Sequence, residues 1–117
     1  MITVETPRKD FIVDRRSDFL IRLICKDGDK VVIDLDGYTF FASVWNQERT
    51  QRFANFAVTY PDRENGVVDL KLTDEQTVLF TENILKYDIL VLDPDGDKTY
   101  ILQGRMFIDE GYTDDES

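Results

Sequence analysis

The stretch Leu35-Asp-Gly-Tyr-Thr-Phe-Phe41 opens a series of strand-like segments that are joined by Asp/Gly turns. It is followed by Val67-Val-Asp-Leu-Lys-Leu-Thr-Asp-Glu-Gln-Thr77, by Tyr87-Asp-Ile-Leu-Val-Leu-Asp-Pro-Asp-Gly96 and by Ile101-Leu-Gln-Gly104. β-branched and aromatic residues favour strands, whereas Asp, Gly and Pro favour the turns between them. The sequence therefore predicts a small antiparallel β domain.

Alternation of side chains within the segments supports this prediction and suggests which faces are buried. Residues 19–25 alternate with period two, an Asp-Gly turn follows at 27–29, and 31–33 is the expected return strand. In the segment 38–46, one face carries Phe40, Ala42 and Val44, and the other carries Phe41, Ser43 and Trp45.

The remaining segments extend the same pattern along the chain. Residues 11–13 and 53–60 are predicted to be strands. The turn at 93–96 separates a strand that begins at Tyr87 from another that ends at about Ile108. Thr73 and Gln76 have the spacing of a helix-capping box, so one short helical turn is expected there. About seven short strands with turns roughly every ten residues favour an all-β sandwich or barrel.

Length and charge limit the function. At 117 residues the chain is expected to be one domain, 1–117, with an N-terminal arm at 1–10 and a mobile acidic tail at 111–117. There are 14 basic and 24 acidic residues, for a formal net charge of −10, which argues against nucleic-acid and anionic-membrane partners. The first nine residues lack a signal-peptide core, so we expect synthesis in the cytoplasm without secretion by a signal peptide.

The sequence shows no motif typical of an enzyme. It has no histidine and one cysteine, Cys25, which excludes Ser-His-Asp and Cys-His sites within the chain and argues against zinc. Asp93, Asp95 and Asp97 alternate like the start of a calcium loop, but the sixth and twelfth positions are Lys98 and Gly104 instead of glycine and glutamate. We expect a hairpin turn there, no metal or other cofactor, and no catalysis.

The outward face of the sheet is the better candidate for a site. If Tyr87, Ile89 and Val91 point into the core, the intervening leucines point outward, where a sandwich usually places polar residues. Exposed apolar clusters mark protein contacts. The predicted interface residues are Phe41, Trp45, Leu90, Leu92, Ile101 and Phe107. The alternative is that the helical turn or the N-terminal arm covers this patch.

The pattern resembles small structural domains of tailed phages and prophages, namely the amino-terminal domain of upper baseplate proteins and related tail or fibre-adaptor proteins. The similarity extends from about Asp18 to Ile108. The matching positions are Asp34, Leu35, Gly37, Tyr38, Thr39, Gly66, Leu72, Thr73, Thr77, Tyr87, Asp88, Ile89, Asp93, Gly96, Leu102 and Gly104.

The resemblance implies an immunoglobulin-like antiparallel β-sandwich that helps to build virions. It implies a tail, baseplate or fibre-connecting module located in the virion, with other virion proteins as partners and with copies that assemble symmetrically. Two alternatives remain open. One is a carbohydrate-binding sandwich in which Phe41, Trp45 and Tyr100 stack on sugar rings, and the other is an acidic inhibitor of a host protein.

Overall fold

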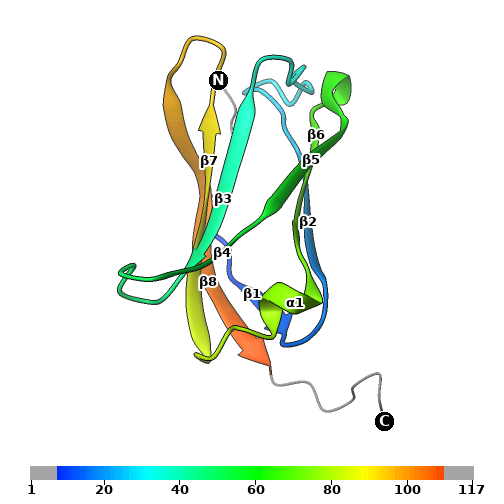
Figure 1. The fold of residues 1–117 in the computed structure, drawn as a ribbon. Coiled ribbons are helices and arrows are strands. Elements are labelled where there is room, and N and C mark those ends of the chain that lie inside the picture. The colour runs from blue at the N-terminus through cyan, green and yellow to red at the C-terminus, as the bar shows by residue number, and fades with distance from the viewer. Residues whose placement is uncertain (1–7, 110–117) are drawn as a thin grey trace.

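The computed structural model describes residues 8–109, which form two β-sheets packed face to face (Figure 1). The larger sheet has the order β1 (Phe11–Asp14), β8 (Lys98–Asp109), β7 (Ile84–Leu92), β3 (Thr39–Trp45) and β4 (Arg52–Asn55). The smaller sheet has the order β2 (Phe19–Ile24), β6 (Val67–Leu72) and β5 (Ala57–Asp62). A 3₁₀ turn, η1 (Arg63–Asn65), and a short helix, α1 (Asp74–Thr77), complete the described chain.

The strand order is that of immunoglobulin-like sandwiches. Taken in chain order, β2, β6 and β5 occupy the places of strands B, E and D, while β3, β7 and β8 occupy those of C, F and G. β4 extends the larger sheet beside β3, and β1 pairs in parallel with β8 at the opposite edge. The predicted fold class is therefore confirmed, with eight strands in the described residues instead of about seven.

The core lies between the sheets and is built from alternate strand residues. Along β7, residues 85, 87, 89 and 91 are buried, and along β3 the buried positions are 40, 42 and 44, as the alternation predicts. Tyr87 is the largest fully buried side chain, and its hydroxyl donates a hydrogen bond to the carbonyl oxygen of Lys9. The single cysteine, Cys25, is buried in the same core, so the sandwich packs without a disulfide.

The expected single strand at 53–60 is wrong in one respect. The chain bends at the buried Phe56, whose N–H donates to the carbonyl oxygen of Ala42 at 2.9 Å. On one side of this bend β4 pairs with β3, and on the other side β5 pairs with β6. The segment therefore changes sheets, which Figure 1 shows as a diagonal crossing between β4 and β5.

The expected return strand at 31–33 is reduced to one antiparallel bridge between Val32 and Lys26, with backbone hydrogen bonds from Asp27 N–H to Val31 and from Ile33 N–H to Cys25. The carboxylate of Asp27 accepts the N–H groups of Asp29 and Val31, which tightens the turn. Beyond this turn the chain leaves the neighbouring strand, and Leu35 N–H donates to the carbonyl oxygen of Arg63 at 2.8 Å. The antiparallel pairing therefore ends after this one bridge.

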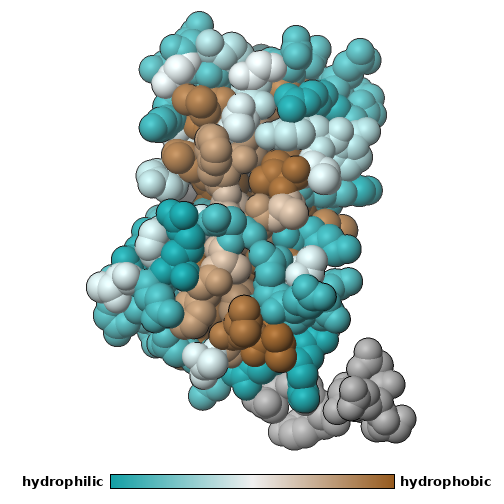
Figure 2. Space-filling view, in the orientation of Figure 1, coloured by the Kyte–Doolittle hydropathy of each residue, from teal (hydrophilic) through white to brown (hydrophobic). Residues whose placement is uncertain are grey.

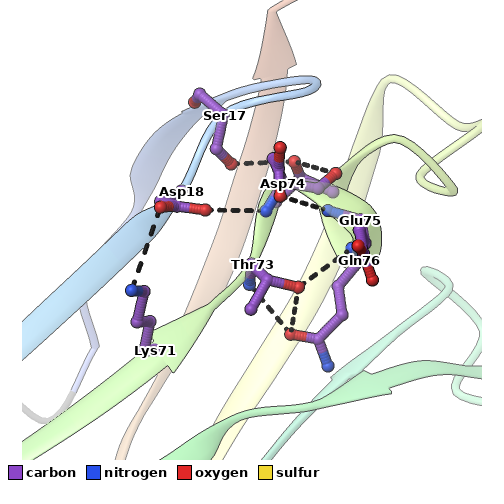
Figure 3. A network of polar contacts seen from close by, with 8 residues as sticks. Ser17, Asp18, Lys71, Thr73, Asp74, Glu75 and Gln76 are labelled. Carbon is purple, nitrogen blue, oxygen red and sulfur yellow. Dashed lines mark hydrogen bonds and ion pairs between the residues drawn. The ribbon is translucent and has the colours of Figure 1, made fainter.

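The predicted capping box at the start of α1 is confirmed. Gln76 N–H donates to the hydroxyl of Thr73, and Thr73 N–H donates to the side-chain oxygen of Gln76 at 2.9 Å. Asp18, the residue immediately before β2, accepts the N–H of Asp74 and pairs with Lys71 (Figure 3). The short helix is thereby fastened to β2 and β6, and it lies at one end of the sandwich (Figure 1).

The N-terminal segment that the structure describes runs beside β8. Lys9 N–H donates to the carbonyl oxygen of Gln103 at 2.9 Å, and the Asp10 carboxylate accepts the N–H of Arg105. The rest of the expected arm and the expected acidic tail at 111–117 lie outside the described residues. Within residues 8–109, no helix has the length and apolar character needed to cross a membrane.

Candidate protein-contact face

The outer face of the five-stranded sheet, referred to below as the outer face, carries most of the predicted interface residues. Pairing across β3, β7 and β8 places Phe41, Leu90 and Tyr100 side by side in one row. Phe41 is 50% exposed and Tyr100 is 64% exposed, so neither α1 nor the described N-terminal residues 8–10 cover them. This row is called the apolar row below, with Leu92 half-buried one row beyond it, opposite Thr39.

The prediction for Ile101 is wrong. Leu102 pairs with Ile89 and Tyr100 pairs with Leu90, so Ile101 is the extra residue of a β-bulge. The bulge turns Ile101 into the core, where it is only 4% exposed, and brings Tyr100 to the outer face instead. An inserted residue shifts the alternation by one position, and the apolar pattern of the sequence gave no sign of it.

Trp45 lies on the outer face but is half-buried. The guanidinium of Arg52 covers its ring at 4.8 Å from the ring centroid, in cation–π geometry. The indole N–H is buried near Asp88 and favours the charged form of that carboxylate, yet it does not reach hydrogen-bond geometry. Trp45 is therefore part of the outer face, but its ring is less accessible to a partner than those of Phe41 and Tyr100.

Phe107 is on the outer face at its other end. It pairs with Ile84 of β7 and with Ile12 of β1, and it is 37% exposed. Ile12, at 71% exposed, is an apolar contact candidate that the sequence analysis missed. Phe107, Ile84 and Ile12 form a second apolar row, separated from the first by polar and charged side chains.

Asp88 stands in the middle of the outer face. Burial raises its pKa, and this effect is only partly offset by the nearby guanidinium groups of Arg49 and Arg52. The Arg49 Nη1 atom lies 3.7 Å from Asp88 Oδ2. Asp88 pairs across the strands with Ser43 and Gln103, so its carboxylate is bordered by polar side chains from both neighbours.

Two hollows mark the outer face. One has a volume of about 420 Å³ and lies at the apolar row, bordered by Phe41, Leu90, Tyr100 and the polar side chains of Ser43 and Asn55. The other has a volume of about 370 Å³ and is lined mainly by charged and amide side chains. In the orientation of Figure 1, the molecular surface shows apolar areas separated by hydrophilic ones (Figure 2).

The aspartate turns have a structural explanation. The Asp93 carboxylate accepts the N–H groups of Asp95 and Asp97, both at 2.9 Å, which confirms the predicted hairpin turn. Across residues 8–109, no group of three or more His, Cys, Asp or Glu side chains is arranged to hold a metal ion. Cys25 is buried, and this burial raises the pKa of its thiol to about 11, which suits a packing role.

No protein-family model matches the sequence, and no curated protein is significantly similar to it. Among solved structures, 77 chains match, one of which is the Lin-41 filamin domain. That domain is 20% identical, with a TM-score of 0.49, over 86% of this chain and 84% of the other.

Proposed function

We propose that this chain is a structural protein of a phage virion, a small tail, baseplate or fibre-connecting module that acts through protein–protein contacts. The observation that carries the proposal is the apolar row, in which Phe41 and Tyr100 are exposed and Leu90 is half-buried, on a sheet face that usually carries polar residues. The phage resemblance supports the location, and the proposal assigns the chain no catalysis and no cofactor.

Contacts through the face are favoured over contacts through the nearby strand edge. β4 pairs with only the last part of β3, which leaves the first part of that edge without a strand. There, Phe40 N–H donates to the Tyr60 hydroxyl at 3.0 Å, and Arg63 donates to the carbonyl oxygens of Leu35 and Tyr38. Side chains that occupy these backbone groups hinder the addition of a foreign strand.

The first test measures association in solution. Light scattering on the eluting protein is expected to give a mass above the 13.7 kDa monomer at high concentration, and Leu90→Ser/Tyr100→Ser is expected to restore the monomer. The control is Leu20→Ser, which removes a leucine that is 53% exposed on the smaller sheet. A Leu20 variant that dissociates as fully as the outer-face variant would exclude a specific contact.

The second test concerns the particle. Mass spectrometry of particles purified from the phage or prophage that encodes the chain is expected to detect it in constant ratio to tail proteins. Detection only in the cleared lysate, as for a host-takeover protein, would exclude a virion role. This outcome would favour the acidic-inhibitor alternative.

Carbohydrate binding is the second candidate, and the hollow at the apolar row favours it. Two exposed rings, Phe41 and Tyr100, border polar Ser43, Asn55 and Asp88, a combination that suits sugar stacking and hydrogen bonding. Trp45 is covered by Arg52 and is less suited to the stacking role expected of it. A glycan array with wild type and Tyr100→Ser separates the two functions, since only the carbohydrate-binding function predicts signals that Tyr100→Ser abolishes.

A further inference from the structure

The second hollow concentrates positive charge on a strongly acidic protein. Its lining includes Arg8, Arg49, Lys86 and Arg105, against the single carboxylate of Asp10. These cations come from four separate segments of a chain whose formal net charge is −10. The local sign is therefore opposite to that of the whole molecule.

The cations in this hollow keep donors available for a ligand. Arg105 Nε lies 3.9 Å from Asp10 Oδ2 and Arg49 Nη1 lies 3.7 Å from Asp88 Oδ2, distances too long for hydrogen bonds. Arg49 uses Nη2 in a long hydrogen bond of 3.4 Å to Gln103 Oε1, which leaves its other donors for a ligand. Within residues 8–109, the side chains of Arg8 and Lys86 make no hydrogen bond or ion pair. Guanidinium and ammonium groups in this state suit a carboxylate or another oxyanion.

The position of the hollow indicates what kind of molecule brings the anion. Lys86 and Arg105 are paired across the strands and lie one row from Ile84 and Phe107. On the other side, one polar row separates them from the apolar row, so apolar contacts flank the hollow at both ends. Side chains on one face of a strand repeat at about 6.6 Å, so the two apolar rows lie about 20 Å apart and an extended segment of about seven residues reaches both. An inorganic ion would use only the middle of this surface.

We infer that the outer face binds an acidic protein segment, with its carboxylates in the hollow lined by Lys86 and Arg105 and with apolar side chains on the flanking rows. This inference rests on the proposed function and specifies the chemistry of the partner. A long polyanion such as nucleic acid is disfavoured because the rest of the surface repels it. A short segment with two or three carboxylates experiences mainly the local positive charge.

The test uses the whole chain and a defined probe. The blocked peptide Ac-Leu-Glu-Glu-Glu-Ser-Ser-Leu-NH₂, whose leucines lie about 20 Å apart when extended, is titrated into ¹⁵N-labelled protein while the amide resonances are followed. We expect shifts concentrated at Lys86, Gln103, Gly104 and Arg105, with affinity that falls as salt is added. Lys86→Gln is expected to weaken binding roughly 3- to 10-fold, as loss of one charge-assisted contact implies. The glutamine analogue of the peptide is expected not to bind.

The matched control is Lys26→Gln, which makes the same charge change on an exposed residue outside the hollow. Equal weakening by the two variants, or shifts spread over all basic residues, would overturn the inference. Binding of inorganic phosphate as tight as that of the peptide would also overturn it, in favour of a small-anion site. The amide spectra themselves report whether each variant is folded.

Failure of the inference and failure of the proposed function give different results. If Leu90→Ser/Tyr100→Ser does not change association while Lys86→Gln weakens peptide binding, the anion site stands and the proposed assembly contact fails. If the apolar variant dissociates the protein and the peptide shows no localised binding, the assembly contact stands and the acidic partner is excluded.

Discussion

Gly104 is a residue whose smallness is required by the path of the N-terminal segment. A Cβ built on it would lie 1.9 Å from the carbonyl oxygen of Lys9 and 2.7 Å from its carbonyl carbon. Those atoms belong to backbone that is held by Gln103 and by the Tyr87 hydroxyl, so they cannot move aside easily. Gly104 therefore permits the close approach of residues 9–10 to β8 and helps to form the hollow beside it.

Gly104→Ala is expected to destabilise the fold by about 1–3 kcal/mol or more, because overpacking forces the backbone apart. Urea denaturation followed by circular dichroism measures the loss. The control is Gly28→Ala, since a Cβ there meets nothing within 4 Å. An equal effect of the two variants would show that the crossing over Gly104 is looser than described.

Cys25 is expected to be chemically inert in the folded protein. Its thiol is buried and its pKa is raised to about 11 by that burial, so the reactive thiolate is scarce at neutral pH. A thiol reagent such as DTNB is expected to react slowly with native protein and rapidly in denaturant. Rapid labelling of the native protein would contradict the placement of Cys25 in the core.

At the scale of elements, α1 is too short to be stable alone and depends on its cap and its attachments. Thr73→Ala removes the hydroxyl that accepts Gln76 N–H, and we expect a loss of about 1 kcal/mol in the free energy of unfolding. Thr73→Ser keeps the acceptor and is expected to lose much less. Equal losses in thermal and urea denaturation of both variants would assign the effect to packing of the threonine methyl group.

The smaller sheet contains a cross-strand ion pair that links stability to pH. Arg22 donates to both carboxylate oxygens of Asp69, at 2.7 and 2.8 Å, and these hydrogen bonds hold the pKa of Asp69 below its usual range. The folded state therefore favours the charged carboxylate, so this contribution is present above the unfolded pKa and is lost as the pH falls through the lower folded pKa.

Asp69→Asn is accordingly expected to lower the urea midpoint at pH 7, with the difference from wild type shrinking as the pH falls below about 4. Parallel urea titrations at several pH values measure this. A difference that is constant across the pH range would mean that the loss comes from neutral packing or hydrogen bonding. The linkage between Asp69 ionisation and folding would then be wrong.

The accuracy of the sequence-based predictions depended on how local the determining signal was. The capping box at Thr73 and the turn at Asp93 were predicted because neighbouring residues determine them. The sheet change at Phe56 and the bulge at Ile101 were not, because the apolar pattern of the sequence gives no sign of either irregularity. Strand pairing, which is non-local, decides where such irregularities occur.

The candidate site was predicted in part for the same reason. Phe41 and Leu90 were assigned to the outer face from period-two alternation within their own strands, and pairing then brings them together. The basic hollow was missed because its cations lie far apart in the sequence and the net charge of −10 conceals them. The one available signal was that Lys86 and Arg105 both occupy outward positions in their strands.

At the scale of the whole molecule, the sandwich combines a closed core with an outer face suited to contacts. Its buried residues form one apolar cluster between the sheets, while the outer face exposes two apolar rows with a charged region between them. Apolar rows alone would favour indiscriminate association, whereas the intervening charges restrict binding to a partner of matching pattern. The proposed role in assembly depends on this combination of apolar rows and charges.

The most direct test of the proposed assembly role is a cryo-electron microscopy reconstruction of the purified particle from the phage or prophage that carries the gene. We predict density for this sandwich in the tail or baseplate, with Phe41, Leu90 and Tyr100 buried against a neighbouring subunit. A particle without such density, or one in which these three side chains face solvent while another surface makes the contacts, would contradict the account.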